Sequence, residues 1–233
     1  TILFKRGDIF LEDLEPKDDG SLENNIVYGA YGTGEDPVLW SVDLLHRRHI
    51  TIQDMHFDMD SGGGGSSKTI AFGCYDVESI DIRRCEIENA PQHGAYIGPF
   101  QEVQIIHCVF HDNGGGFMEH NIYLSGNGTP AGSDNIVIDG CEIYNAGTVG
   151  IQMNPNGDST SNFLDNVTIR NCRIHDNEVG IGDYGSRNLL LHNNSIYNNN
   201  GIDYYNDQIG GNIVSTGAEI YNNTFYNLNP SWG

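Results

Sequence analysis

Residues 136–145 read IVIDGCEIYN, and the same arrangement recurs along most of the chain. It consists of an apolar-x-apolar triplet, two or three polar residues, a small residue, a variable residue, another apolar residue, and then Asn or Asp. The other copies are ITIQDMHFDM from Ile50, IDIRRCEIEN from Ile80, VQIIHCVFHDN from Val103, VTIRNCRIHDN from Val167, LLLHNNSIYNN from Leu189 and AEIYNNTFYN from Ala218. Self-similarity on this length scale indicates a repeat protein whose units stack on one another.

The small residue of the repeat gives the length of one unit. It recurs at spacings of 30, 23, 33, 31, 22 and 29 residues. The shortest spacings give the basic unit, and the longer ones indicate loop insertions. The residues at this position are Met55, Cys85, Cys108, Cys141, Cys172, Asn194 and Asn223.

A second type of strand-like segment lies between successive copies of the repeat. Within each segment apolar and other residues alternate with a period of two, which is typical of β-strands. Each unit then contains about three short strands, and units of this kind stack into a parallel solenoid. We therefore predict an all-β, single-stranded, right-handed parallel β-helix of about seven to eight coils. The segments are GAYIG from Gly94, NIYLS from Asn121, GIQMN from Gly150, GIGDY from Gly180 and GIDYY from Gly201.

The repeats divide the chain into two regions. Residues 1–45 are predicted to form an N-terminal cap and the first coil, and residues 46–233 one continuous domain of coils. The sequence starts directly in an apolar, strand-like run at Thr1, so we expect it to be part of a longer chain.

Five cysteines are present, so they cannot all pair within the chain. Four of them occupy the small position of the repeat and are predicted to stack inside the coil at roughly 4.8 Å. Asn194 and Asn223 continue this ladder, where their side-chain amides can bond along the axis. We interpret the cysteines as buried free thiols, including Cys74, which aligns with the inward residue Ile97.

The chain is strongly acidic because it contains few basic residues. It has 32 Asp plus Glu against 11 Lys plus Arg, a formal charge of −21 and a pI near 4.4. Binding to nucleic acid or to anionic membrane surfaces depends on positive charge, so we expect neither partner. A mean hydropathy of −0.40 agrees with a globular protein.

The first residues add a resemblance to a known group. TILFKRGDIF (residues 1–10) and IVYGAYGTGEDPVL (residues 26–39) resemble the start of secreted bacterial β-helix proteins of the pectate-lyase-like superfamily, in which such a segment caps the solenoid. The group includes polysaccharide lyases, epimerases, glycoside hydrolases and tailspike-like proteins. The resemblance implies a polysaccharide partner and an extracellular or cell-surface location.

In that group the substrate lies along one sheet, which here is the sheet formed by the second type of segment. Alternation places Tyr96, Tyr123, Gln152, Gly182 and Asp203 in one outward row, and Gly98, Ser125, Asn154, Tyr184 and Tyr205 in another. Aromatic rings can stack on sugars, and amides and carboxylates can bond to hydroxyl groups. The predicted substrate-binding residues are Tyr96, Gln152, Asn154, Tyr184, Asp203, Tyr205 and Lys68.

The predicted catalytic residues are His93, Glu119, His120 and Tyr123, on two adjacent rungs. Two histidines and a carboxylate can serve as general acid and base or hold a transition metal. They can equally be exposed turn residues. The resemblance implies β-elimination, with His93 or His120 as base, Tyr123 or Tyr96 as acid, and Lys68 with a bound cation such as Ca²⁺ neutralising a uronate.

Two other functions remain open. A glycoside hydrolase on a neutral glycan would use Glu119 with Asp203. Asp183, on the neighbouring rung, is turned inward by strict alternation. A non-catalytic adhesive, structural or fibre-forming module would use its open solenoid ends for end-to-end self-assembly. The remaining histidines of the repeat, His56, His107, His111, His175 and His192, we interpret as surface ladders.

Overall fold

The computed structural model describes residues 1–61, 68–116, 118–126, 133–155, 164–200, 204–206 and 215–227, with the backbone alone for 204–206. Within these residues every helix or strand element is a β-strand, and all strand pairs are parallel. They form a ten-stranded and a fifteen-stranded sheet. The all-β parallel solenoid predicted from the repeat is confirmed.

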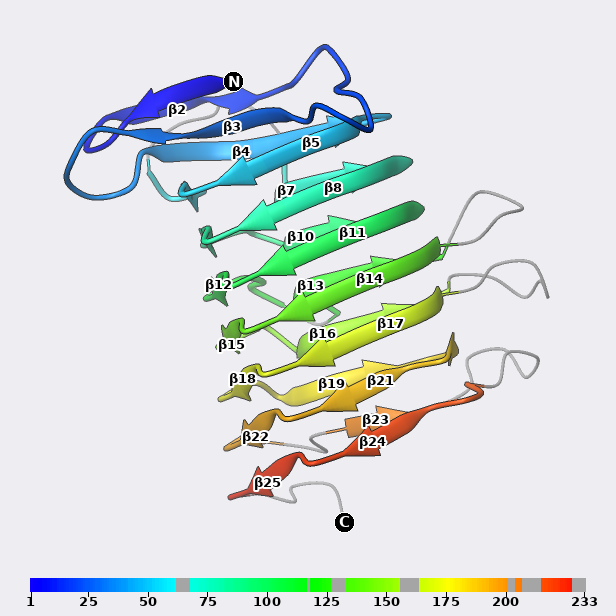
Figure 1. The fold of residues 1–233 in the computed structure, drawn as a ribbon. Coiled ribbons are helices and arrows are strands. Elements are labelled where there is room, and N and C mark those ends of the chain that lie inside the picture. The colour runs from blue at the N-terminus through cyan, green and yellow to red at the C-terminus, as the bar shows by residue number, and fades with distance from the viewer. Residues whose placement is uncertain are drawn as a thin grey trace.

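The ten-stranded sheet forms the face that is nearest the viewer in Figure 1, and we call it the long face. Its strands lie one above another from the N-terminus at the top to the C-terminus at the bottom. In spatial order they are β1 (Ile2–Lys5), β3 (Ile26–Tyr31), β5 (Arg48–Gln53), β8 (Val77–Arg83), β11 (Phe100–Ile106), β14 (Ser133–Asp139), β17 (Leu164–Arg170), β21 (Leu190–His192) and β24 (Glu219–Tyr221), with β20 (Ser186–Arg187) beside β17.

The fifteen-stranded sheet supplies two further faces, because β4 pairs with β6 through Val38 and with β7 through Val42. We call them the tyrosine face and the short face. The tyrosine face contains β2 (Ile9–Leu14), β4 (Val38–Leu45), β7 (Ile70–Tyr75), β10 (His93–Ile97), β13 (His120–Ser125), β16 (Val149–Asn154), β19 (Val179–Asp183) and β23 (Tyr204–Asn206). The short face contains β6 (His56–Asp58), β9 (Glu86–Glu88), β12 (Val109–His111), β15 (Glu142–Tyr144), β18 (Arg173–His175), β22 (Ser195–Tyr197) and β25 (Thr224–Tyr226).

The core runs along the solenoid axis and is built from the apolar positions of the repeat. On the long face Ile80, Val103 and Ile136 are in register and fully buried. The central residue of every short strand except β25, such as Ile87 or Phe110, is buried as well. Burying a side chain of this size contributes about 1.5–3 kcal/mol, so each rung adds several such contributions.

Two corners of each coil explain why Asn and Asp recur in the repeat. The residue between the long and the short strand is left-handed in successive coils, and so is the residue after the short strand. Left-handed backbone is costly for most residues but is tolerated by Gly, Asn and Asp. The first corner contains Asp54, Arg84, His107, Gly140, Asn171, Asn193 and Asn222, and the second contains Asn89, Asp112, Asn145, Asp176, Asn198 and Asn227.

The predicted ladder of small residues is present inside the coil. All five cysteines are buried free thiols. The Sγ atom of Cys108 lies 3.6 Å from the carbonyl oxygen of Ile82 in the preceding rung. Burial raises the pKa of Cys108 well above its ordinary value, so this thiol stays protonated. Below the cysteines, Asn194 donates from Nδ2 to Oδ1 of Asn223 at 2.9 Å.

The first 45 residues contribute strands to the same sheets. β1 pairs with β3 and β3 with β5, while β2 pairs with β4. Several apolar side chains of β1 and β2 are exposed, as are those of β24 and β25 at the other end of the described stack: Ile2, Leu3, Ile9, Leu11, Ile220 and Phe225. In the described part of the chain there is no helix with the length and apolar character needed to cross a membrane.

Candidate functional site

The predicted outward row of the tyrosine face lies on one line across four strands. Tyr96 of β10 is in register with Tyr123 of β13. Tyr123 is in register with Gln152 of β16, and Gln152 with Gly182 of β19. The row therefore brings four of the positions that alternation predicted onto one line, along which Tyr96 and Tyr123 are half-buried and Gln152 and Gly182 are buried.

Two predicted catalytic histidines stand next to this row. His93 and His120 are in register and buried, with exposed fractions of 6% and 3%. The backbone N–H of His120 donates to Nδ1 of His93 at 3.3 Å, and the N–H of Val149 donates to Nδ1 of His120 at 3.3 Å. Because each Nδ1 accepts a hydrogen bond, the neutral ring carries its proton on Nε2.

Both histidines are held neutral. Burial lowers the pKa of His93 from 6.5 to about 4. Burial, and secondarily the charge of His93, lowers the pKa of His120 from 6.5 to about 3. With Nδ1 occupied and protonation disfavoured, each ring presents a donating Nε2–H. This arrangement gives little support to the predicted role of His93 or His120 as a base.

The aromatic rings of the tyrosine face stack on one another. The ring centroids of Tyr96 and Tyr123 are 5.5 Å apart at 16°, and those of Tyr75 and Tyr96 are 6.5 Å apart at 17°. His93 and His120 stack at 5.3 Å, and His93 lies 5.0 Å from Tyr123. The ring faces are thus largely covered by neighbouring rings.

Gln152 and Tyr184 continue the strip beyond the stacked tyrosines. A Cβ atom at Gly182 would lie 3.3 Å from a ring carbon of Tyr184 and 3.4 Å from Oε1 of Gln152. The Tyr184 ring therefore lies over the position where Gly182 has no side chain. Asn154 is half-buried and in register with Ser125, one line further along the strands.

Glu119 contacts Gly116 through its side chain and Thr148 through its backbone. Its carboxylate lies against Gly116, where a Cβ would come within 3.2 Å of Oε2. Oε2 is buried and has no hydrogen-bond partner among the described residues. The backbone of Glu119 is bonded to Thr148, whose N–H donates to the Glu119 carbonyl at 2.8 Å. Of the four predicted catalytic residues, the structure thus places His93, His120 and Tyr123 in mutual contact.

Lys68 is engaged by carboxylates of the chain itself. Its Nζ atom is 2.9 Å from Oδ2 of Asp13, 3.7 Å from Oε1 of Glu15 and 3.8 Å from Oδ2 of Asp43. The charge predicted to neutralise a substrate is therefore used to hold the first coils together.

The register of the last strand of the tyrosine face differs from the prediction. Tyr205 is in register with Gly182 rather than with Tyr184, so its backbone belongs to the row of Tyr96 and Tyr123. The Gly-Ile alignment placed this strand two residues away from its observed register, in which Tyr204 is paired with Ile181. Asp203 and the side chain of Tyr205 lie outside the described residues.

The inward orientation of Asp183 is confirmed. Asp183 is fully buried and in register with Met153. Its Oδ1 accepts a hydrogen bond from the backbone N–H of Ser186 at 2.9 Å, and its Oδ2 accepts one from the Ser186 hydroxyl at 2.9 Å. Asp183 therefore closes a turn instead of facing a substrate.

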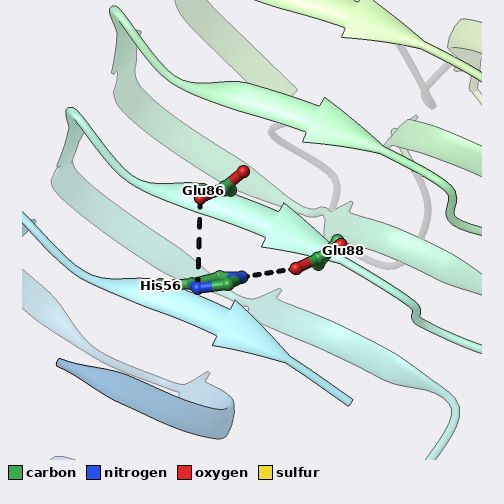
Figure 2. Close-up of side chains that lie close together, drawn as sticks. All are labelled: His56, Glu86 and Glu88. Carbon is green, nitrogen blue, oxygen red and sulfur yellow. Dashed lines mark hydrogen bonds and ion pairs between the residues drawn. The ribbon is translucent and has the colours of Figure 1, made fainter. Parts of the chain in front are cut away.

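Groups that could hold a metal lie elsewhere. Within the described residues, one set of three clustered ligands is His56, Glu86 and Glu88 (Figure 2), and the other is Glu88, His111 and Asp112. Both sets lie on or next to the short face. The sequence analysis treated these histidines as surface ladders. The short strands alternate polar, apolar and polar residues, as in Glu86-Ile87-Glu88, and this pattern contained the signal, but only the register brings the side chains together.

The short face also carries a second column of rings. Its planes are nearly parallel, and its centroids are spaced by 4.6–5.1 Å. This column confirms a ladder for two histidines of the repeat, but His111, at 7% exposure, is buried and not on the surface. Its members are His111, Tyr144, His175, Tyr197 and Tyr226.

Among solved structures, the chain is similar to an alginate lyase from Paenibacillus sp. str. FPU-7, with 12% identity, a TM-score of 0.61 and coverage of 98% of this chain and 89% of that one. It is also similar to ORF18 of Geobacillus virus E2, with 16% identity and a TM-score of 0.56. The alignment covers 97% of this chain and 52% of the viral protein, so the chain spans about half of that protein's length. At these identities the likeness shows the fold. No curated protein matched the sequence.

The sequence itself matches the family described as "Right handed beta helix region" over residues 45–163 and 118–231. These two matches together cover most of the chain, and they agree with the parallel rungs and the inward ladder described above. The chain therefore belongs to the right-handed β-helix family.

Proposed function

We propose that the chain is a carbohydrate-active protein that binds an extracellular or cell-surface polysaccharide along the tyrosine face and cleaves it by β-elimination. The observation that carries the proposal is the strip formed by Tyr96, Tyr123, Gln152 and Tyr184 across successive strands. Rungs repeat along the axis as sugar units repeat along a glycan, so a linear polymer can contact several of them at once.

The likeness to an alginate lyase supports an acidic glycan as the substrate class. Elimination needs a base for the C5 proton and an acid for the leaving oxygen. The bonding of Nδ1 makes His93 and His120 donors through Nε2–H, suited to orienting a substrate carboxylate. We assign the acid role to the hydroxyl of Tyr123 and the base role to the carboxylate of Glu119, which must turn away from Gly116 to reach a substrate.

A cation is part of this proposal. Each of the eleven Lys and Arg side chains lies within ion-pair distance of a carboxylate, which leaves the excess of acid uncompensated. A polyuronate approaching a chain of charge −21 meets repulsion that a divalent cation would screen and bridge. We expect Ca²⁺ to raise turnover on uronates and EDTA to lower it.

The test is incubation with alginate, pectate, ulvan and neutral glycans while the absorbance of unsaturated uronates and the formation of reducing ends are followed together. New absorbance is expected on at least one uronate, with loss of activity in Glu119→Gln and an unchanged rate in Tyr197→Phe on the short face. If reducing ends form without absorbance, the reaction is hydrolysis, and the chain is a glycoside hydrolase instead of a lyase. If neither absorbance nor reducing ends form on any glycan of the panel, the proposal that the chain is an enzyme is refuted.

A second function is favoured by the exposed apolar residues at both ends of the described stack. Ile9 is 61% exposed and Phe225 is 41% exposed, each on a terminal strand where further rungs or another copy would cover it. A non-catalytic fibre module would assemble end to end through such surfaces. Light scattering over a concentration series tests this: concentration-dependent growth that Ile9→Asp abolishes supports assembly, and a constant monomer mass excludes it.

A further inference from the structure

The short face carries a cluster of imidazoles and carboxylates on three consecutive strands. His56 lies on β6, Glu86 and Glu88 on β9, and His111 on β12. Figure 2 shows His56 beneath the two glutamates, with dashed lines from its ring to each of them. These residues are far from the strip on the tyrosine face that the proposed function uses, because they belong to the other arm of the fifteen-stranded sheet.

The distances within the cluster are short enough for shared coordination. His56 Nε2 lies 2.7 Å from Oε1 of Glu88, and His56 Nδ1 lies 3.9 Å from Oε2 of Glu86. One ligand atom from each of these three residues lies within 4.8 Å of the others. Zinc bonds to imidazole nitrogen and carboxylate oxygen at roughly 2.0–2.2 Å, so ligands around one ion are separated by roughly 3–3.5 Å. Small side-chain rotations would bring the three groups to that spacing.

The two glutamates are also oriented from their far side. Nε2 of His111 lies 3.0 Å from Oε1 of Glu86, and Nδ1 of His111 lies 3.7 Å from Oε2 of Glu88. Asp112 in turn holds Nδ1 of His111 at 2.7 Å. Carboxylates and imidazoles that are fixed by outer partners in this way are typical of metal sites, because the ligands are then ordered before the ion arrives.

The charge of the cluster favours a cation. Among the described residues, the ion pairs of Glu86, Glu88 and Asp112 are all with histidines, and none is with a Lys or Arg side chain. The carboxylates thus attract positive charge, which a divalent ion would supply.

A second copy of the arrangement two rungs further on provides an internal comparison. His175 Nε2 lies 3.2 Å from Oε1 of Glu142, and its Nδ1 lies 2.7 Å from Asp176, as in the His111 set. Here, however, Arg173 donates to both oxygens of Glu142, at 3.1 and 2.6 Å. Tyr144 stands in the register position of Glu88. The second copy therefore has one carboxylate fewer, and its glutamate is already neutralised.

We propose that His56, Glu86 and Glu88 bind one divalent transition-metal ion such as Zn²⁺, with His111 and Asp112 orienting the two carboxylates. A nitrogen ligand with two carboxylate oxygens suits zinc and its neighbours better than calcium, which prefers oxygen alone. Three protein ligands leave a coordination position for water. The ion would link β6 to β9 across residues that are 30 or more positions apart in sequence, and would so stabilise the N-terminal rungs.

The test uses the full chain after EDTA treatment and removal of the chelator. Zn²⁺ is titrated by calorimetry, and bound metal is measured after gel filtration. One saturable equivalent is expected, with affinity reduced at least about tenfold in His56→Ala and in Glu88→Gln. His175→Ala is the matched control and should bind like the wild type. The same zinc concentration should raise the Tm of the wild type and of His175→Ala but not that of Glu88→Gln.

Circular dichroism first establishes that each variant is folded, and the isosteric Glu88→Gln substitution decides the question if His56→Ala is not. Absence of saturable zinc binding in the wild type would overturn the site. So would a zinc affinity that falls equally in Glu88→Gln and His175→Ala, or in neither. Saturation by Ca²⁺ at concentrations where Zn²⁺ does not bind would overturn the assignment to a transition metal.

Discussion

The Nδ1 atom of His93 lies 3.3 Å from the backbone nitrogen of His120, whose N–H donates to it. This bond links two rungs through a side chain, and His120 repeats it to Val149. It also fixes the tautomer, because the accepting nitrogen cannot carry the proton of the neutral ring. The imidazoles of the tyrosine face are therefore part of the rung-to-rung bonding as well as part of the candidate site.

The first prediction concerns pH. The folded pKa values of His93 and His120, about 4 and about 3, are below the ordinary value of 6.5, so the unfolded chain binds more protons between these limits. The stability that these rings contribute is complete above pH 6.5 and is lost as the pH falls toward 4. Each ring should remove up to about 1.4 kcal/mol of the free energy of unfolding per pH unit.

Chemical denaturation between pH 7.5 and 4.5 measures this effect. The free energy of unfolding should fall more steeply with decreasing pH in the wild type than in His120→Gln, which lacks one of the two titrating rings. His107→Asn, at an exposed corner of the coil, should keep the wild-type slope. Parallel curves for the wild type and His120→Gln would show that the buried ring does not titrate in this way.

The second prediction separates the hydroxyl of Tyr123 from its ring. The ring stacks on Tyr96, His93 and His120 at centroid distances of 5.5, 5.0 and 5.6 Å. Tyr123→Phe keeps this stack and removes the proposed proton donor, so kcat should fall by about 10²–10⁴-fold with little change in Tm. Tyr123→Ala should lower both activity and Tm. Full activity in Tyr123→Phe would exclude the hydroxyl from the reaction.

The third prediction tests the inward ladder. Asn194 accepts the Cys172 N–H at 2.9 Å and donates to the carbonyl of Ile169 at 3.0 Å, all inside the coil. Asn194→Ala leaves buried backbone groups unpaired and should cost about 1–3 kcal/mol. Asn194→Cys should cost less, since the Cys108 sulfur accepts the Cys85 N–H at 3.5 Å in the same slot. Urea unfolding measures both variants. An equal loss of unfolding free energy in Asn194→Ala and Asn194→Cys would show that the ladder side chain does not stabilise the coil by pairing these backbone groups.

The architecture could be predicted from the sequence because each rung repeats the same local rule. Period-two alternation identifies inward residues such as Ile97, and the recurring cysteines mark a slot that admits small side chains. The row of Tyr96, Tyr123 and Gln152 followed from the same alternation. In these cases the information lies within about ten residues, so no knowledge of distant contacts is needed.

The chemistry of the candidate site could not be predicted in the same way, because it depends on contacts between rungs. The ion pair of Lys68 with Asp13 and the backbone bond to His93 Nδ1 join residues that are distant in sequence. The cluster of His56 with Glu88 likewise requires the register of β6 and β9. The strand at Tyr204 was misplaced by two residues because the Gly-Ile pair does not set its register.

The last prediction concerns the left-handed corners. Asn171 has a φ of 56° and lies between Arg170 of the long face and Cys172 of the ladder, while Gly140 occupies the equivalent corner one rung earlier with a φ of 67°. A β-branched residue is strained in this conformation, so Asn171→Val should lower the free energy of unfolding by about 1–2 kcal/mol. Asn171→Gly relieves the strain but loses the bond from Nδ2 to Asp139 at 2.7 Å, which is exposed. We expect its cost to be clearly smaller than that of the valine. Denaturation of both variants at neutral pH would show this order, and a valine variant as stable as the glycine variant would mean that the corner does not require left-handed backbone.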